Sequence, residues 1–365
     1  MSSVWGNNIK ISVFGESHGE NIGVVIDAPP AGIKIDTEYI LLQMSRRAPG
    51  LDDTATKRKE SDFPKIISGV KNGITTGAPL TAIIENSDSH SKDYSELEIK
   101  PRPSHADYAA HIHYGGFEDV RGGGHFSGRL TAPIVFAGSL LRIYLKQMGI
   151  TIGGHIERIG NVTDERFSPA FIDEKELNCL SGKTFAVRNE ITEQKMRNEI
   201  LSAAKNGDSV GGILEIAVTG IDAGFGNPMF NGVENVISSA VFGIPAVKGI
   251  EFGDGFDFAK GHGSNSNDEM YIENGKVKCK TNHCGGITGG ITNGMPIIFR
   301  VAFKPTPSVS FAQNTVNLKL MQNDTLTVKG RHDPCVVPRA LAAVEAMTAI
   351  AVVDLLKEVP FIATV

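Results

Sequence analysis

Residues 339–358 read RALAAVEAMTAIAVVDLLKE, and this stretch decides how the chain must fold. Written as a helix, it is apolar on almost every side, and Pro338 directly precedes it, as is common where a helix starts. A helix without a polar face is stable only where other elements cover it all round. We therefore expect this helix to be buried in the interior of the protein.

Three further helices are expected. Residues 131–148 carry an apolar face, residues 191–206 are amphipathic, and a glycine suited to the left-handed position follows each stretch. The third helix is expected over residues 37–46, with Asp36 or Thr37 as its N-cap.

Strand-like runs accompany these helices, and several of them alternate apolar and polar residues, as in an antiparallel sheet with one covered face. They comprise residues 10–15, 23–28, 80–86, 211–220 and 296–304. Strands and helices do not alternate strictly, which argues against a doubly wound parallel sheet. We predict an α+β fold of layered sheets and helices, in a single large domain over residues 1–365.

The composition excludes several classes of protein. The chain has 365 residues, of which 41% are hydrophobic and 21% charged, as in a globular protein with a buried core. A net charge of −5 argues against nucleic-acid binding, and no stretch approaches the ~20 apolar residues of a membrane helix. Four scattered cysteines and no secretory signal indicate a reduced, cytoplasmic protein.

Glycine-rich loops with cationic ends are the first sign of a ligand. VRGGGHFSGR, residues 120–129, holds three glycines and a histidine between Arg121 and Arg129. It does not match the dinucleotide-binding pattern G-x-G-x-x-G, and SGKT at 181–184 lacks the first glycine of a P-loop. Any phosphate site must therefore use cationic side chains and irregular loops. HIH at 111–113 has no partners at zinc-like spacing, so we expect no metal.

Other polar motifs are each explained by folding when taken singly, as solvated turns or helix ends. They are FGESHGE (14–20), MSRRAPG (44–50), RPSHADY (102–108), FKPTPS (303–308) and KGRHDP (329–334). Together they bring several arginines and lysines into loops stiffened by proline or loosened by glycine, which suits a multiply charged anion. Their histidines titrate near neutral pH, as general acids must. The residues favour acid–base chemistry on a phosphorylated carboxylic acid.

Three of these segments are similar to the characteristic segments of chorismate synthases, in the same order. They are FGESHGENIGVVIDAPP, RGGGHFSGRLTA and GRHDPCVVPRA, and shorter matches such as GDSVGG, NHCGGITGGI and KPTPS extend the resemblance from about residue 6 to 355. The resemblance implies a shikimate-pathway lyase of aromatic amino acid biosynthesis. It would form chorismate by anti-1,4-elimination of phosphate from 5-enolpyruvylshikimate-3-phosphate.

The same resemblance implies reduced FMN as cofactor, without net redox change, and a homotetramer with a layered sandwich of antiparallel sheets and helices. An electron-rich flavin suits this reaction, because the departing phosphate leaves a carbon short of electrons. Some family members reduce FMN with NADPH and others depend on an external source. We see no added reductase domain, so we expect an external flavin reductant, with NADPH only as an indirect electron source.

Site residues follow from the resemblance, position by position. His18 would protonate the reduced flavin, His105 would assist the leaving phosphate as an acid, and Asp333 would relay a proton with the flavin. The residues implied for substrate binding are Arg46, Arg47, Arg102 and Arg129. The residues implied for FMN binding are His125, Phe126, Ser127, Pro245, Ala246, Gly289, Lys304, Pro305, Thr306, Pro307, Ser308 and Arg331.

The chain departs from the family pattern at four positions. His125 and Phe126 stand where many members have arginine and a small residue, and Pro245 stands where asparagine is common. Asp53 lies where some members carry a further anion-binding arginine. We expect functional binding of FMN and substrate with altered affinity.

Two other functions stay open. A flavin-dependent oxidoreductase would use the same FMN for net hydride transfer to or from a small anion, and it would oxidise flavin as substrate reacts. A non-catalytic anion-binding protein would keep its binding after replacement of His18 and His105.

Overall fold

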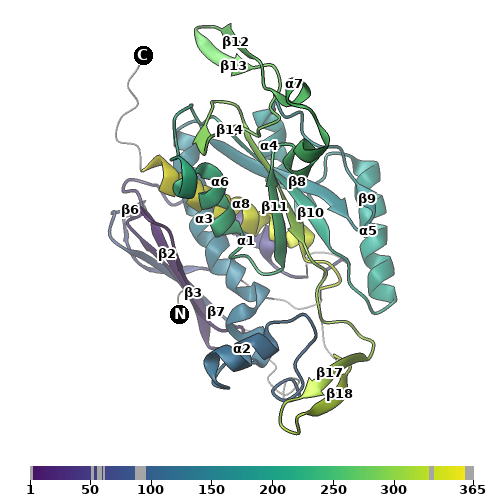
Figure 1. Cartoon of the computed structure of the whole chain (residues 1–365). Helices are drawn as coiled ribbons and strands as arrows, with labels where there is room; N and C mark the ends of the chain where they lie inside the picture. The colour runs from purple at the N-terminus through teal and green to yellow at the C-terminus, as the bar shows by residue number, and fades with distance from the viewer. Residues whose placement is uncertain are drawn as a thin grey trace.

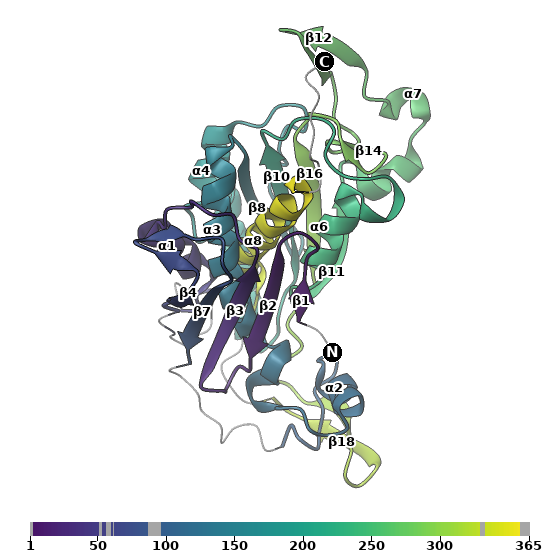
Figure 2. The ribbon, with the colours of Figure 1, turned by 90° about the vertical axis from the view of Figure 1, so that its left-hand side faces the viewer.

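The C-terminal helix α8 (Val337–Leu356) is buried along its length, as its apolar sequence predicts. Every residue from Leu341 to Leu355 is inaccessible to solvent or nearly so. Figures 1 and 2 show α8 and α3 (Thr131–Gln147) between two sheets of the computed structural model. The structure describes residues 3–50, 53–55, 60, 62–86, 96–328 and 333–357.

The N-terminal sheet has five antiparallel strands in the order β1-β2-β3-β7-β4. Alternate residues of its central strands face the helices. In the register of these strands, Val13 of β2 lies opposite Val24 of β3, and Val24 lies opposite Ala82 of β7. The strands are β1 (Val4–Trp5), β2 (Lys10–Gly15), β3 (Asn21–Asp27), β4 (Lys65–Ser68) and β7 (Leu80–Glu85).

The second sheet also has five antiparallel strands, in the order β11-β16-β10-β8-β9. Helix α8 packs against β8 and β10, and so closes the sandwich from this side. The strands are β8 (Thr151–Ile159), β9 (Val162–Thr163), β10 (Gly212–Thr219), β11 (Val247–Phe252) and β16 (Ile297–Phe303).

The two central helices cross in close contact, and a glycine makes this possible. A Cβ atom on Gly138 of α3 would lie 2.3 Å from the Cα of Ala346 on α8, closer than any packing allows. The end of α8 also holds the bend that leads into β2: Asp354 Oδ1 accepts hydrogen bonds from the backbone N–H groups of Asn7 (3.0 Å), Asn8 (2.6 Å) and Ile9 (2.9 Å). The sandwich is therefore closed by residues from both ends of the chain.

The remaining elements surround this sandwich. Helix α2 and the β17–β18 hairpin lie together at the lower end in Figure 1, and the β12–β13 hairpin projects at the upper end. The helices are α1 (Thr37–Arg47), α2 (Asp107–Tyr114), α4 (Glu174–Leu180), α5 (Glu190–Lys205), α6 (Val233–Val241) and α7 (Gly263–Ser266). The hairpin strands are β5 (Val70–Lys71), β6 (Ile74–Thr75), β12 (Met270–Glu273), β13 (Lys276–Cys279), β14 (Ile287–Thr288), β15 (Ile291–Thr292), β17 (Gln313–Asn317) and β18 (Gln322–Leu326).

The layered α+β architecture with antiparallel sheets is confirmed, and each helix and strand expected from the sequence is present with ends shifted by no more than two residues. One continuous apolar core runs from Ile9 to Leu355 and includes both sheets. The extent of the single domain over residues 1–365 stays a prediction. Within the described ranges, no helix is long and apolar enough to cross a bilayer.

Candidate active site

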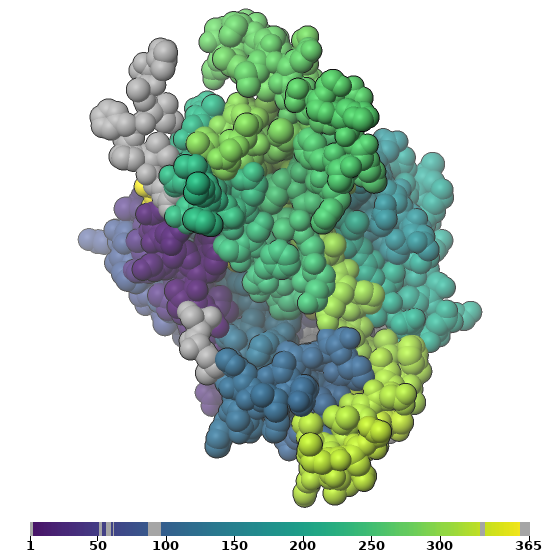
Figure 3. Space-filling view, in the orientation of Figure 1, coloured from purple at the N-terminus to yellow at the C-terminus, as the bar shows by residue number. Residues whose placement is uncertain are grey.

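A cavity of about 860 Å³ lies where the N-terminal strands, the glycine-rich loop and the start of α8 meet. Figure 3 shows a hollow on this side, between the blue part of the surface that includes α2 and the green part above it. Most of the residues that the sequence singled out line this cavity. They are Arg47, Arg102, His105, His125, Phe126, Ser127, Arg129, Pro245, Ala246, Lys304, Thr306, Pro307, Ser308 and Asp333.

The glycine-rich loop takes a shape that other residues would not tolerate. Gly122, Gly123 and Gly124 have φ values of 60°, 83° and 54°, in the left-handed region that glycine adopts without strain. A Cβ on Gly122 would lie 2.2 Å from the ring of His18. His18, only 8% exposed, is therefore packed against the backbone of this loop, although it is not among the described residues of the cavity wall.

His125 fastens the same loop to the N-terminal sheet. Its Nδ1 lies 2.8 Å from the carbonyl oxygen of Gly15, and its Nε2 contacts the hydroxyl of Ser3. Because a carbonyl only accepts, Nδ1 carries the proton and donates it to Gly15. Both ring nitrogens of His125 are therefore held by neutral groups of the N-terminal segment. The adjacent Phe126 side chain is 40% exposed.

His105 and Arg102 share one buried carboxylate. Asp107, the first residue of α2, receives hydrogen bonds from Arg102 Nε and Nη2, both at 2.8 Å, and contacts His105 Nδ1. Burial alone would raise the pKa of Asp107, but the hydrogen bonds from Arg102 and His105 outweigh it and hold that pKa well below its ordinary value. His105 Nδ1 faces both a donor, Arg102 Nη2 at 3.1 Å, and an acceptor, the Asp107 carboxylate. Because the contact with the ionised carboxylate is the closer one, we place a proton on Nδ1, which donates it to Asp107. The Nε2 edge of His105 then faces the glycine-rich loop at Gly123.

Two arginines at the cavity meet on a second buried carboxylate. Arg47 Nη1 donates to Asp62 Oδ2 at 2.5 Å and Arg129 Nη1 donates to Asp62 Oδ1, while Glu60 also pairs with Arg129 Nη1. Asp62 is 2% exposed. Burial would raise the pKa of Asp62, but the charges of Arg47 and Arg129 outweigh it and lower that pKa. Thr131 Oγ1 accepts from Arg47 Nε at 3.2 Å and fixes this end of α1.

A third set of polar contacts at the cavity lies at the start of α8. Asp333 pairs with Arg339 at 2.9 Å, and its carbonyl oxygen accepts from the Thr306 hydroxyl at 2.8 Å. Burial and the neighbouring Lys248 lower the pKa of Lys304, which lies on the same side of the cavity as Thr306. Cations and hydroxyls therefore surround the cavity from several elements.

Sequence reasoning missed the acidic partners of these cations. Glu60 and Asp62 lie at the end of TKRKESD (56–62), and two acidic residues just after three cationic ones are a signal that was available. Asp107 follows His105 by two residues and carries the same kind of signal. The sequence showed the cations as an anion site, whereas the structure shows carboxylates already bound to them.

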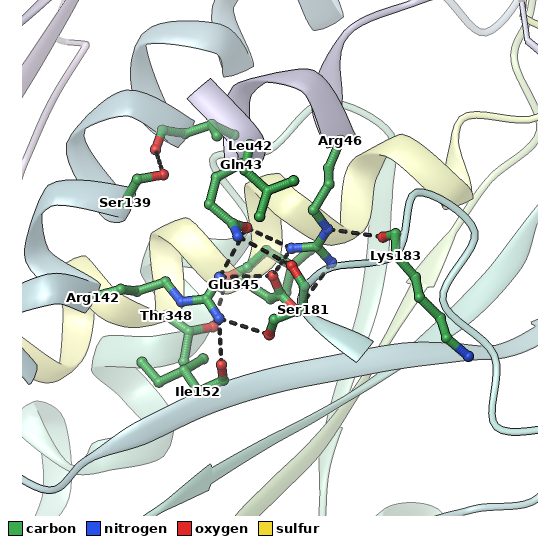
Figure 4. Close-up of polar contacts among 12 residues, drawn as sticks. Leu42, Gln43, Arg46, Ser139, Arg142, Ile152, Ser181, Lys183, Glu345 and Thr348 are labelled. Carbon is green, nitrogen blue, oxygen red and sulfur yellow. Dashed lines mark hydrogen bonds and ion pairs between the residues drawn. The ribbon is translucent and has the colours of Figure 1, made fainter. Parts of the chain in front are cut away.

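Four predicted residues are not part of the described cavity wall: His18, Arg46, Gly289 and Pro305. Arg46 lies in the core instead: it is 2% exposed, pairs with Glu345 at 2.5 Å and donates to the Lys183 carbonyl oxygen at 3.0 Å. Figure 4 shows this network, in which Arg142 meets the same Glu345. The next residue of α1, Arg47, takes the position at the cavity. Gly289, in the turn between β14 and β15, and Pro305 are not part of the described wall.

Arg331 lies outside the described residues, so its predicted role in FMN binding has no structural counterpart here. Asp53, where some members carry arginine, is described and exposed. The carboxylate-bound arginines of the cavity are therefore Arg47, Arg102, Arg129 and Arg339.

Comparisons with known proteins agree over nearly the whole chain. A model of the chorismate synthase family matches residues 9–356. The chain is 44% identical over 349 residues to chorismate synthase of Thermococcus gammatolerans and 45% identical over 349 residues to that of Pyrococcus abyssi, with 96% of each chain covered in both cases. A crystal structure of chorismate synthase superposes with a TM-score of 0.76 at 27% identity, covering 97% of this chain and 93% of the other. The chain belongs to the chorismate synthase family, whose members are lyases of the shikimate pathway.

Proposed function

We propose that the 860 Å³ cavity is the active site in which this chain eliminates phosphate from 5-enolpyruvylshikimate-3-phosphate to give chorismate. The observation that carries the proposal is the meeting of a glycine-rich loop, an Asp-oriented histidine and several arginines around one cavity. Each group alone suits a structural role, but their convergence suits the binding and protonation of a phosphorylated carboxylic acid.

The residues present fit FMN as a ligand of this cavity. Its volume lies in the upper part of the range for small-molecule sites, and Gly122 of the glycine-rich loop brings backbone without a side chain to the cavity wall. Lys304, Thr306 and Ser308 offer a cation and hydroxyls for the flavin phosphate, and His125 to Ser127 with Pro245 and Ala246 would line the ring. When bound, reduced FMN supplies electron density to the carbon that the phosphate leaves.

The side chains of this chain would bind the substrate and move its protons. Arg47, Arg102 and Arg129 bind the phosphate and carboxylate groups, which planar guanidiniums match with paired hydrogen bonds. His105, held by Asp107 through Nδ1, donates a proton from Nε2 to the departing phosphate. His18 and Asp333 are proposed to hold protons beside the flavin, His18 behind Gly122 and Asp333 next to Arg339.

The setting of the reaction is part of the proposal. We propose that the protein works in the cytoplasm as a homotetramer and receives electrons from an external flavin reductant, with NADPH as an indirect source. All four cysteines are unpaired thiols, which supports a reducing compartment.

An anaerobic assay with 5-enolpyruvylshikimate-3-phosphate and chemically reduced FMN tests the reaction. Equal release of chorismate and phosphate, with the flavin still reduced, is the expected result. Flavin oxidised one-for-one with substrate would instead support the oxidoreductase alternative, and no product at all would contradict the proposal.

FMN binding has a readout of its own. Trp5, the sole tryptophan, lines the cavity and donates from Nε1 to the Ser239 hydroxyl at 3.0 Å. We expect FMN to quench its fluorescence in a saturable manner. If calorimetry shows that FMN binds while the Trp5 fluorescence stays unchanged, this cavity is excluded as the flavin site.

A further inference from the structure

Arg129 is occupied by the protein's own acceptors. Its Nε donates to Asn86 Oδ1 at 2.9 Å, its Nη1 is shared by Asp62 and Glu60, and its Nη2 is 3.4 Å from the Glu85 carbonyl oxygen. Acceptors among the described residues thus face four of its five N–H groups, so a substrate anion that binds this guanidinium with paired hydrogen bonds must take the place of at least one of them. Only a charged acceptor competes with a carboxylate for a buried guanidinium, and the part of the chain that the structure describes places two carboxylates at Arg129.

The two carboxylates hold different positions. Asp62 bridges Arg47 and Arg129 and is not among the described residues that line the cavity. Glu60 contacts Arg129 and does line the cavity. An anion in the cavity therefore meets the Glu60 carboxylate, whereas Asp62, which binds both guanidiniums, is not part of the described wall.

We propose that Glu60 is a resident counter-ion, which the substrate's phosphate or carboxylate displaces from Arg129, while Asp62 remains as the anchor of both arginines. The proposal rests on the assignment of this cavity as the substrate site. Without ligand, the two carboxylates cancel the charges of Arg47 and Arg129, so the buried guanidiniums are never left unpaired. Once Glu60 moves aside, the pair of arginines carries one net positive charge toward the bound anion.

Glu60 therefore acts as a positioning residue that sets affinity and does not take part in the chemistry. Binding of the substrate is weakened by the competition, and release of the phosphate product is helped by the return of Glu60 to Arg129. Both effects concern the binding and release of anions, so a change at Glu60 should alter KM more than kcat.

The test is Glu60→Gln, which keeps the shape of the side chain and removes its charge. The matched control is Glu38→Gln, which removes the same charge at the exposed first turn of α1. Inorganic phosphate is titrated calorimetrically into each protein with FMN at saturation, so that the flavin phosphate site is filled. We expect Glu60→Gln to bind phosphate on the order of tenfold more tightly, since one repelling charge is lost, and Glu38→Gln to match wild type.

Turnover provides the second readout. In Glu60→Gln, KM for 5-enolpyruvylshikimate-3-phosphate is expected to fall by a similar factor, without an increase in kcat. Unchanged or weaker phosphate binding would overturn the proposal, as would a collapse of kcat with KM unchanged. The calorimetric readout does not depend on turnover, so an inactive wild type would contradict the proposed function and leave the phosphate titration as the test of Glu60.

Asp62→Asn tests the division of roles. Because Asp62 holds both guanidiniums, its loss is expected to weaken phosphate binding in a variant that still unfolds cooperatively. If Asp62→Asn binds phosphate as tightly as Glu60→Gln does, both carboxylates are displaced and the anchoring role of Asp62 is wrong.

Discussion

The Asp107 carboxylate orients the imidazole of His105, the residue proposed as the general acid. Asp107 fixes the Nδ1 proton of His105 and, through two hydrogen bonds at 2.8 Å, the plane of Arg102. The proposed proton donor and the proposed anion-binding guanidinium are thus both oriented by a single side chain.

Asp107→Asn is expected to lower kcat/KM by about 100-fold or more, because the amide neither fixes the imidazole tautomer nor balances Arg102. Steady-state kinetics over a range of pH would check this, with a shift of the acidic limb expected as well. Asp257→Asn, at an exposed pair with Lys260, serves as the control. Wild-type kinetics in Asp107→Asn would show that His105 needs no partner.

His125→Arg tests the departure from the family pattern in the glycine-rich loop. Arginine adds a permanent charge near the proposed flavin site, and we expect FMN to bind about fivefold more tightly. Quenching of Trp5 fluorescence would measure this, with His113→Arg on the exposed side of α2 as control. An unchanged affinity would mean that the charge at this position is irrelevant and that the bonds to Gly15 and Ser3 are its role.

At the scale of single residues, the sequence predicts the cations better than their partners. The motifs single out Arg47, Arg102 and Arg129, which line the cavity, but nothing in them says that Asp62 and Glu60 come from a separate segment to meet Arg47 and Arg129. Arg46 and Arg47 are adjacent and chemically alike, and only the direction of the last turn of α1 sends one to the core and the other to the cavity.

At the scale of elements, the pattern of apolar residues predicts α8 and its neighbours, but it does not predict β8. The pattern of TIGGHIERI is obscured by two glycines and by buried polar residues. Gly154 is required because a Cβ there would lie 2.5 Å from the side chain of Ile216 on β10. His155 is buried because Glu215 on β10 lies 2.9 Å from its Nε2. Such contacts between strands are invisible to a reading of one strand at a time.

Helix α8 contains one charge whose removal should be costly. Glu345 is completely buried and pairs with Arg46 at 2.5 Å and Arg142 at 2.9 Å (Figure 4). Glu345→Gln leaves two buried guanidiniums without their carboxylate, and we expect the free energy of unfolding to fall by about 3–5 kcal/mol. Urea unfolding would measure it, with the exposed Glu174→Gln of α4 as control. A loss below about 1 kcal/mol would show that water or neighbouring groups replace the carboxylate.

For the whole molecule, the buried carboxylates predict a weakness toward acid. Burial raises the pKa values of Asp62, Asp107 and Glu345, but their arginine partners outweigh it, so that all three pKa values are lowered in the folded state. The unfolded chain therefore binds more protons below about pH 4, and the stabilisation present above that pH is lost as the pH falls. The urea midpoint should decrease steeply from pH 5 to 3.

The same experiment contains its own control. In Glu345→Gln the decrease between pH 5 and 3 should be smaller than in wild type, since one of the three carboxylates is absent. Equal slopes for both proteins would show that other groups govern unfolding in acid.

The bond between Asp354 and the backbone of residues 7–9 has a consequence for the synthesis of the protein. The two partners are 345 residues apart for Ile9, so the ribosome needs roughly 20–70 s to make the second after the first. During this time the bend before β2 emerges without the carboxylate that accepts hydrogen bonds from its N–H groups. A nascent chain that stops before α8 lacks both this tie and one wall of the cavity, so the proposed FMN site stays incomplete until α8 has been made.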